Sequence, residues 1–226
     1  KGEIIIFIDS DVLVNSHFIQ EHLRYHQKYH GIVVRGLVIN TPDIKNLAEK
    51  KMKLTDISTA FFATGNVSVR KSYLVKAGPF NENFKEYGWE DLEMGERLKK
   101  LDLKVRTNKK ALGYHYQKKL YLADLPKICA KEEARGRTAV IFYKKHPTFS
   151  VKCMTQISFP FFFLDRLLTI GNWINANWGR KLLFYLEKQE HYLLLNFFMK
   201  IISQHSYMDG IREALKKSFK GRELDK

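Results

Sequence analysis

The sequence predicts an α/β fold that is followed by a helical region. Three observations carry this prediction. The chain opens with the apolar run Ile4–Ile8, short β-branched runs alternate with helical patterns as far as residue 119, and strand patterns stop at Leu120. We therefore expect two regions, residues 1–119 and residues 120–226. Hydrophobic residues make up 45% of the chain, which is typical of a globular protein.

The run Ile4–Ile8 ends in Asp9 and Asp11. Five apolar residues in a row indicate a strand that is buried on both faces of a parallel sheet. Ligands of open α/β sheets bind beyond the carboxyl ends of such strands, so we expect both aspartates at a ligand crevice. Neighbouring carboxylates favour a hard divalent cation, Mg²⁺ or Mn²⁺. A plain turn with a helix cap is an alternative that these residues alone leave open.

A buried parallel strand needs neighbours, which βαβ units normally supply. We therefore expect further units of the fold to precede residue 1, so that the N-terminal half of the domain is missing from this chain. The sequence contains no glycine-rich phosphate loop of the P-loop or dinucleotide type.

The remaining elements of the first region follow from periodicity and from turn residues. Glycine or proline closes two of the helices, at Gly31 and at Gly78-Pro79. The expected elements are a helix over 16–29, a strand over 32–39, a turn at 40–43, a charged helix over 44–54, strands over 59–63 and 67–69, helices over 70–77 and 89–101, and a strand over 104–112.

The second region is predicted to be helical. A helix over 120–146 ends in basic residues followed by Pro147. The uncharged run Cys153–Leu164 is too short to span a bilayer, which needs about 20 apolar residues. Residues 180–202 carry an apolar stripe at helical spacing, with Trp173 and Trp178 nearby. Such a stripe packs in a core or lies in a membrane interface, and both interpretations stay open.

Two further features suggest chemistry. Glu90 and Asp91 follow Trp89 at the start of a predicted helix, where the helix dipole favours ionised carboxylates. Such a carboxylate can act as a general base towards a hydroxyl group, or it can simply stabilise the helix. His115 follows the last predicted strand, where an imidazole can bind an ion such as Mn²⁺, although a lone histidine is more often an ordinary residue.

The order and spacing of these features resemble the glycosyltransferase family 2 enzymes over roughly residues 1–145. Asp9-Ser10-Asp11 is similar to that family's DxD motif, and Thr64-Gly65-Asn66 to its glycine loop near the donor sugar. The segment Gly78–Phe84 followed by Gly88–Asp91 resembles the G-x-F-D/N-E segment and the ED motif. His115 resembles the late metal-binding histidine of many members.

The resemblance implies a GT-A fold, with a mixed, mostly parallel sheet and flanking helices, and an inverting transfer from a nucleotide-diphospho-sugar. On the donor side, the resemblance implies metal binding by Asp11 and His115, with Asp9 at the donor ribose or a metal-bound water, and donor contacts from Gly65 and Asn66. On the acceptor side, it implies general base catalysis by Asp91 and acceptor contacts from Trp89 and Glu90. The divalent metal, Mn²⁺ or Mg²⁺, would act as a Lewis acid on the leaving diphosphate. The proton can leave the acceptor late, so Asp91 needs no raised pKa.

Arg135 and Arg137 lie on the following predicted helix. Either they contact the donor diphosphate, because Arg suits phosphate oxygens, or they form a solvated face paired with Glu132 and Glu133. The second interpretation is favoured, since charge runs are usually solvated faces.

Charge and composition indicate the kind of partner and the compartment. The net charge of +15 is spread over both halves and indicates an anionic partner, such as a nucleoside diphosphate or acidic lipid headgroups. Two cysteines without a CxxC motif fit a reducing compartment. We expect a glycan or lipid-linked acceptor of polysaccharide or glycolipid synthesis, and a cytoplasmic protein peripheral to the membrane.

Two alternatives belong to other classes. A nucleotidyltransferase of similar fold would release pyrophosphate, but the ED motif beside a tryptophan argues against it. A basic nucleic-acid-binding protein fits the charge, yet the sequence shows no helix-turn-helix, RRM or zinc pattern, so no nucleic acid is expected.

Overall fold

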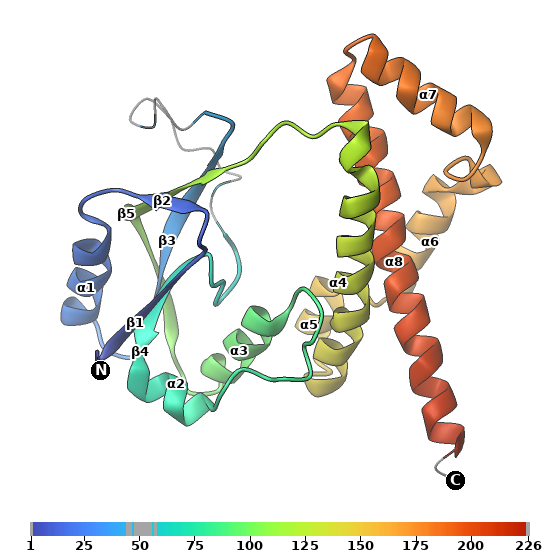
Figure 1. Cartoon of the computed structure of the whole chain (residues 1–226). Helices are drawn as coiled ribbons and strands as arrows, with labels where there is room; N and C mark the ends of the chain where they lie inside the picture. The colour runs from blue at the N-terminus through green and yellow to red at the C-terminus, as the bar shows by residue number, and fades with distance from the viewer. Residues whose placement is uncertain (1, 44–46, 48–55, 57, 225–226) are drawn as a thin grey trace. The chain divides into compact units, whose positions relative to one another are not determined.

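The computed structural model describes residues 2–43, 47, 56 and 58–224, with the backbone alone for residues 219–224. The chain divides into two compact units (Figure 1). The first, Lys1–Asn81 with Glu90–Lys119, contains the sheet, and we call it the sheet unit. The second, Glu82–Trp89 with Leu120–Lys226, contains the C-terminal helices, and we call it the helical unit.

One mixed sheet organises the sheet unit, with strand order β1-β4-β3-β5-β2. Its elements are β1 (Ile4–Ile8), β2 (Val12–Val14), α1 (Phe18–Lys28), β3 (Ile32–Thr41), β4 (Asn66–Arg70), α2 (Lys71–Ala77), α3 (Glu90–Lys99) and β5 (Lys104–Tyr116). The α/β class is confirmed. The expectation of a mostly parallel sheet is wrong for the described strands, because only β3 and β5 pair in parallel and the other neighbours are antiparallel.

The first strand forms where it is predicted, but its surroundings differ. In the described sheet β1 pairs with β4 alone, so it lies at an edge and is half-buried. The central positions belong to β4 and β3, whose residues are mostly buried. The apolar run Ile4–Ile8 therefore does not mark a strand covered on both faces here.

The core of the sheet unit joins the sheet to α3. Val33, Val67 and Val69 from the strands pack with Met94 and Leu98 of α3. Phe62, also fully buried, lies in the same cluster. A Cβ atom placed on Gly95 of α3 would lie 3.2 Å from the Phe62 Cβ, so the helix approaches this segment closely. This packing fixes the start of α3 against the chain that leads into β4.

Three predictions for this unit need correction. Residues 59–63 form no strand; Arg35 Nη1 donates to the Ala60 carbonyl at 2.6 Å, and the segment is held by side-chain contacts. The short β2 was not predicted, and β5 extends four residues beyond the expected end, to Tyr116. The charged helix expected over 44–54 falls outside the described residues.

The helical unit contains η3 (Leu122–Asp124), α4 (Leu125–Lys145), α5 (Phe149–Met154), α6 (Phe159–Leu168), η4 (Ile170–Asn172), α7 (Asn177–Lys188) and α8 (Tyr192–Leu224), where η marks short 3₁₀ helices. The helix expected over 120–146 is confirmed as α4 with η3 before it. The apolar stripe of residues 180–202 belongs to two helices, because the helical conformation is interrupted between Lys188 and Tyr192. None of the described helices is long and apolar enough to cross a membrane.

Helices α4 and α8 lie side by side at backbone contact (Figure 1). A Cβ atom on Gly136 would lie 2.1 Å from the Tyr207 carbonyl oxygen, and one on Gly210 would lie 2.1 Å from that of Glu133. Real side chains cannot come so close. The crossing therefore depends on a glycine from each helix.

Candidate functional site

His115 and Asp11 meet at the pairing of β2 with β5, where Val12 lies opposite His115. His115 Nε2 lies 3.2 Å from Asp11 Oδ2, and its Nδ1 lies 2.9 Å from Asn40 Oδ1. An amide oxygen can only accept, so Nδ1 carries a proton. In the neutral imidazole Nε2 then directs a lone pair at a carboxylate oxygen. A second proton or a metal ion resolves this conflict, so the donor set fits a cation.

Asp9 belongs to a different part of the site. A Cβ atom on Gly65 would lie 3.0 Å from Asp9 Oδ2, so this carboxylate lies directly over the glycine backbone. Within the described residues, no three His, Cys, Asp or Glu side chains form a group that could hold a metal ion. The structure thus brings Asp11 and His115 together and leaves Asp9 outside their pair. A metal at this pair would need further oxygens from a substrate or water.

Asp91 lies in the first turn of α3 and contacts the same turn as Asp9. Its Oδ2 accepts a hydrogen bond from the Thr64 backbone N–H at 3.4 Å, and its Oδ1 accepts from the Leu92 N–H at 2.7 Å. Burial raises the pKa of the Asp91 carboxyl above the usual value, despite these hydrogen bonds. A carboxylate with a raised pKa is a stronger proton acceptor.

Glu90 leaves one carboxylate oxygen without a partner. Its Oε2 is buried and has no hydrogen-bond donor in the part of the chain that the structure describes. Such an atom costs free energy unless a donor reaches it. A hydroxyl group of an acceptor is a donor of the required kind.

A buried ion pair within α3 stabilises the helix that carries the site. Glu93 is fully buried and receives hydrogen bonds from Arg97 at 2.9–3.1 Å. Arg97 Nη1 also donates to the carbonyl oxygens of Ala77 and Gly78. The helix that carries Glu90 and Asp91 is therefore tied to the end of α2.

Asn66 does not occupy the position expected of a donor-binding side chain. It is buried, and its Nδ2 donates to the carbonyl oxygens of Leu37 and Ala111 at 2.9 and 3.0 Å. Its Oδ1 lies 2.9 Å from His22 Nε2. Both amide hydrogens are thus used inside the sheet, at the register shift between β3 and β5. Asn66 holds this irregularity together.

A buried chain of hydrogen bonds continues from Asn66 into α1. Ser68 Oγ lies 2.8 Å from His22 Nδ1 and 2.9 Å from His26 Nε2. Since His22 donates to Asn66, its Nδ1 accepts from Ser68, and Ser68 accepts from His26. Burial lowers the pKa of both imidazoles, that of His26 to about 4. Sequence analysis did not find these residues, although two histidines four positions apart share one helix face.

Trp89 is a packing residue in the helical unit. Its ring is 8% exposed, stacks on Phe142 at 5.8 Å between centroids, and donates from Nε1 to the Arg135 carbonyl at 2.9 Å. Its φ of 75° lies in the left-handed region, which a bulky residue adopts only when its surroundings enforce it. A buried ring offers no open face for a sugar, so the expected stacking role of Trp89 is not supported.

Arg135 and Arg137 are paired with acids. Arg135 Nη2 lies 2.6 Å from Glu132, and Arg137 lies 2.7 Å from both Glu133 and Glu86. The Arg135 guanidinium also lies over the Tyr207 ring, 4.6 Å from its centroid. The predicted pairing with Glu132 and Glu133 is present, but the two arginines are only partly exposed and do not form a fully solvated face. Nothing in this arrangement favours the diphosphate contact.

Comparison with known proteins finds similarity to glycosyltransferases. A family model described as the N-terminal domain of galactosyltransferase matches residues 46–119, a range that includes Gly65, Asp91 and His115. A hyaluronan synthase of Pasteurella multocida is 37% identical over 68 residues, which are 30% of this chain and 7% of that protein. A chondroitin synthase of Escherichia coli is 36% identical over 66 residues, which are 29% of this chain and 10% of that protein. These similarities support a glycosyltransferase that resembles those of family 2.

One relative is similar over most of the chain. It is the uncharacterized glycosyltransferase YfnE of Bacillus subtilis, 24% identical over 261 aligned positions that cover 89% of this chain and 62% of that protein. The chain thus spans less than two thirds of the length of each of these relatives. The substrates of the whole protein therefore do not follow from these similarities.

Proposed function

We propose that the protein is an inverting glycosyltransferase that moves a sugar from a nucleotide-diphospho-sugar to a hydroxyl group of a glycan or lipid-linked acceptor. The observation that carries this proposal is the turn Thr64-Gly65. Asp9 lies over Gly65, and Asp91 accepts from the Thr64 N–H. Two carboxylates from distant parts of the sequence therefore flank one short turn.

On the donor side, Asp11 and His115 would hold a divalent metal, Mn²⁺ or Mg²⁺. The metal would supply Lewis-acid stabilisation of the charge on the leaving diphosphate. Asn40 holds the imidazole with Nε2 towards Asp11. Gly65 has no side chain, so it leaves room for the Asp9 carboxylate, which we assign to the donor ribose or to a metal-bound water.

On the acceptor side, Asp91 takes the proton of the attacking hydroxyl group. The hydroxyl oxygen bonds to the anomeric carbon as the bond from that carbon to the diphosphate oxygen breaks. Attack opposite the leaving group inverts the anomeric centre. The raised pKa of Asp91 suits it to accept a proton, and the unpartnered Glu90 Oε2 can accept a hydrogen bond from a second hydroxyl group of the acceptor.

The names of the synthase relatives concern polysaccharides, and the chain is strongly basic. Both support a role in polysaccharide or glycolipid synthesis. We place the protein at the cytoplasmic face of a membrane, where lipid-linked acceptors are held at an anionic surface.

The test measures nucleoside diphosphate release from a panel of galactosyl, glucosyl, glucuronosyl and N-acetylhexosaminyl donors, with Mn²⁺ or Mg²⁺ and a membrane extract as acceptor. Asp91→Asn should lower the rate at least about 100-fold, the loss typical for a general base. Glu96→Gln is the matched control, because Glu96 lies on the same helix and pairs with Lys99. Pyrophosphate release, or full activity of Asp91→Asn, would overturn the proposal.

A further inference from the structure

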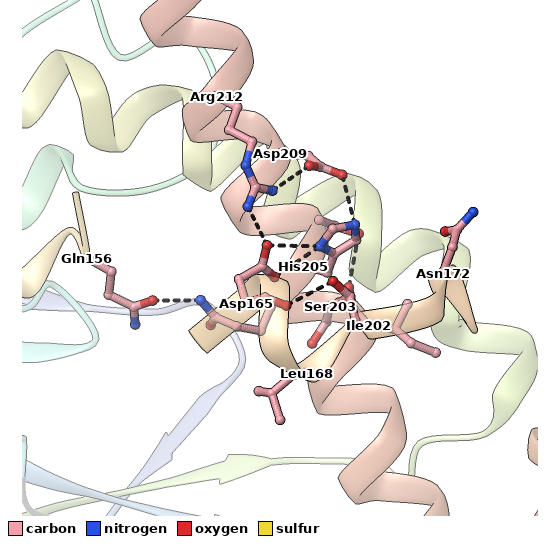
Figure 2. A network of polar contacts seen from close by, with 12 residues as sticks. Gln156, Asp165, Leu168, Asn172, Ile202, Ser203, His205, Asp209 and Arg212 are labelled. Atoms are coloured by element: carbon pink, nitrogen blue, oxygen red, sulfur yellow. Dashed lines mark hydrogen bonds and ion pairs between the residues drawn. The ribbon is translucent and has the colours of Figure 1, made fainter. Parts of the chain in front are cut away.

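Helix α6 buries its acidic residue and exposes two of its phenylalanines. Its acidic residue, Asp165, is 5% exposed and accepts hydrogen bonds from His205 and Arg212 of α8. Figure 2 shows these side chains converging between the two helices, with Asp209 closing the network through His205 and Arg212. Phe162 of α6 lies under the Arg212 guanidinium, 5.6 Å from it, whereas Phe159 is 79% exposed and Phe163 57%.

A helix of a water-soluble domain buries its apolar side and exposes its charges. Helix α6 departs from this rule, because Asp165 is buried and paired inside the bundle while Phe159 and Phe163 are exposed. This arrangement is typical of helices in contact with lipid, where ionisable groups turn to the protein interior. The burial of Asp165 means that the exposed rings are not the result of loose packing.

Helices α7 and α8 extend the exposed apolar surface. Each buries one stripe in the core of the helical unit, such as Leu183 and Leu195, and leaves a second stripe exposed. We name the exposed surface of α6, η4, α7 and the first turns of α8 the aromatic face. Its most exposed members are Phe159, Phe163, Ile170, Trp178, Phe184 and Leu193, each at least 57% exposed.

Ring contacts link the parts of this face. Exposed Phe197 touches Phe198, which packs edge-on against Trp173 at 5.4 Å between centroids. Trp173 lies 6.4 Å from exposed Trp178 and donates from Nε1 to the Leu168 carbonyl of α6. Trp173 therefore links the end of α6 to exposed aromatic residues of α7 and α8.

The exposed charged residues on the helices of the aromatic face indicate which kind of partner binds there. Between residues 159 and 200 the exposed basic residues are Arg166, Arg180, Lys181, Lys188 and Lys200, whereas Glu190 is the exposed acid. The other two acids in this range are engaged, Asp165 in its network and Glu187 with the Leu122 N–H. An excess of exposed basic residues on the segment that carries the exposed aromatic residues complements an anionic bilayer, and it disfavours a second copy of a chain with a charge of +15.

We propose that the aromatic face binds in the plane of an anionic lipid bilayer, with its rings at the headgroup level and its Lys and Arg side chains at the lipid phosphates. This names the surface that holds the proposed transferase at its membrane. The biological purpose of lipid binding rests on the proposed function. The binding itself does not, because it is measured without sugar donor or acceptor. Loss of transferase activity and loss of lipid binding are therefore separate outcomes.

The test is flotation of the whole protein with vesicles of phosphatidylcholine alone and with one quarter phosphatidylglycerol, at 0.1 and 0.5 M NaCl. The protein should float with the anionic vesicles at least about ten times better than with the neutral ones, and less at high salt. Emission of the tryptophans should shift to the blue on binding, because Trp178 is 59% exposed in the free protein.

Variants locate the surface. Phe163→Ser with Leu193→Ser should weaken vesicle binding at least about tenfold, since each lost CH₂ group costs about 0.8 kcal/mol of membrane affinity. Val75→Ser is the control, because Val75 is 71% exposed on α2, outside the aromatic face. Circular dichroism and thermal melts confirm that the variants fold.

Three results would overturn the proposal. These are equal binding to neutral and anionic vesicles, unchanged binding of the double variant, and no binding by a folded wild-type protein. A concentration-dependent dimer that the double variant abolishes, without vesicle binding, would assign the face to a second copy instead.

Discussion

His115 Nε2 lies 3.2 Å from Asp11 Oδ2 across the pairing of β2 with β5, and 104 residues of sequence separate the two. Asn40, on the neighbouring strand β3, contacts the other ring nitrogen and so determines which nitrogen faces the carboxylate. The arrangement fits a metal ion bound at the pair, and metal binding can be tested without substrate.

Asn40→Ala should weaken Mn²⁺ binding about 10- to 100-fold, the range for loss of a group that orients a metal ligand. The free imidazole can then rotate and direct either nitrogen at Asp11. Paramagnetic resonance of free Mn²⁺ during titration of the protein measures the affinity directly. His115→Ala should abolish binding, whereas Asn15→Ala, which removes a half-buried amide that donates to the Lys110 carbonyl, should leave the affinity unchanged.

The pH dependence of stability should carry the signature of His26. Its folded-state pKa of about 4 lies below its ordinary value of 6.5, so the unfolded chain takes up the proton more readily. This stabilisation is complete above pH 6.5 and is lost as the pH falls from 6.5 towards 4. Urea unfolding at pH 7.5, 6 and 5 measures the loss.

His26→Gln should flatten this dependence, because a glutamine N–H can still donate to Ser68 but does not titrate over this range. His30→Gln is the control, since His30 lies outside the buried chain of hydrogen bonds. An equally steep loss in His26→Gln would assign the pH dependence to other groups.

Gly136→Ala should destabilise the protein by several kcal/mol, because its new methyl carbon would lie 2.1 Å from the Tyr207 carbonyl oxygen. An ordinary exchange of glycine for alanine within a helix stabilises it by about 1 kcal/mol, so the expected sign is reversed. Thermal unfolding gives the comparison. Lys127→Ala, at an exposed position of the same helix, should change the melting temperature little.

Trp89→Ala should act on stability and not on recognition of the acceptor. Removing the buried ring costs about 3–5 kcal/mol of the free energy of unfolding. Trp89→Phe keeps a ring against Phe142 but loses the hydrogen bond to the Arg135 carbonyl, at a cost of about 1 kcal/mol. At a temperature where both variants are folded, the KM for the acceptor should stay unchanged. A raised KM in a folded Trp89→Phe protein would restore the stacking role.

Local patterns in the sequence identified many of the elements and the charged residues at their ends. The run Ile4–Ile8, the helix near Asp91 and the strand that ends near His115 all form, since apolar periodicity and turn residues act over short distances. The same patterns indicated Asp9, Asp11, Asp91 and His115 as candidates. Whether those four act in catalysis stays a prediction.

What the sequence could not show depends on distant contacts. Asn66 follows a glycine as a loop residue would, yet the gap between β3 and β5 draws its amide into the sheet. Trp89 precedes two acids, yet its ring packs on a helix more than 50 residues further along. An apolar run does not determine the direction in which a strand pairs. The run Ile4–Ile8 therefore could not show that β1 pairs antiparallel at an edge of the described sheet.

The segment Glu82–Trp89 has a consequence for how the chain can be divided. Its flanking residues belong to the sheet unit, but the segment packs in the helical unit, where Glu86 binds Arg137 and the Tyr87 carbonyl accepts from Thr138. The polypeptide therefore passes between the units three times. A single proteolytic cut after Lys119 should leave two fragments that co-elute under native conditions and separate only in denaturant. A clean separation of the units would require three cuts.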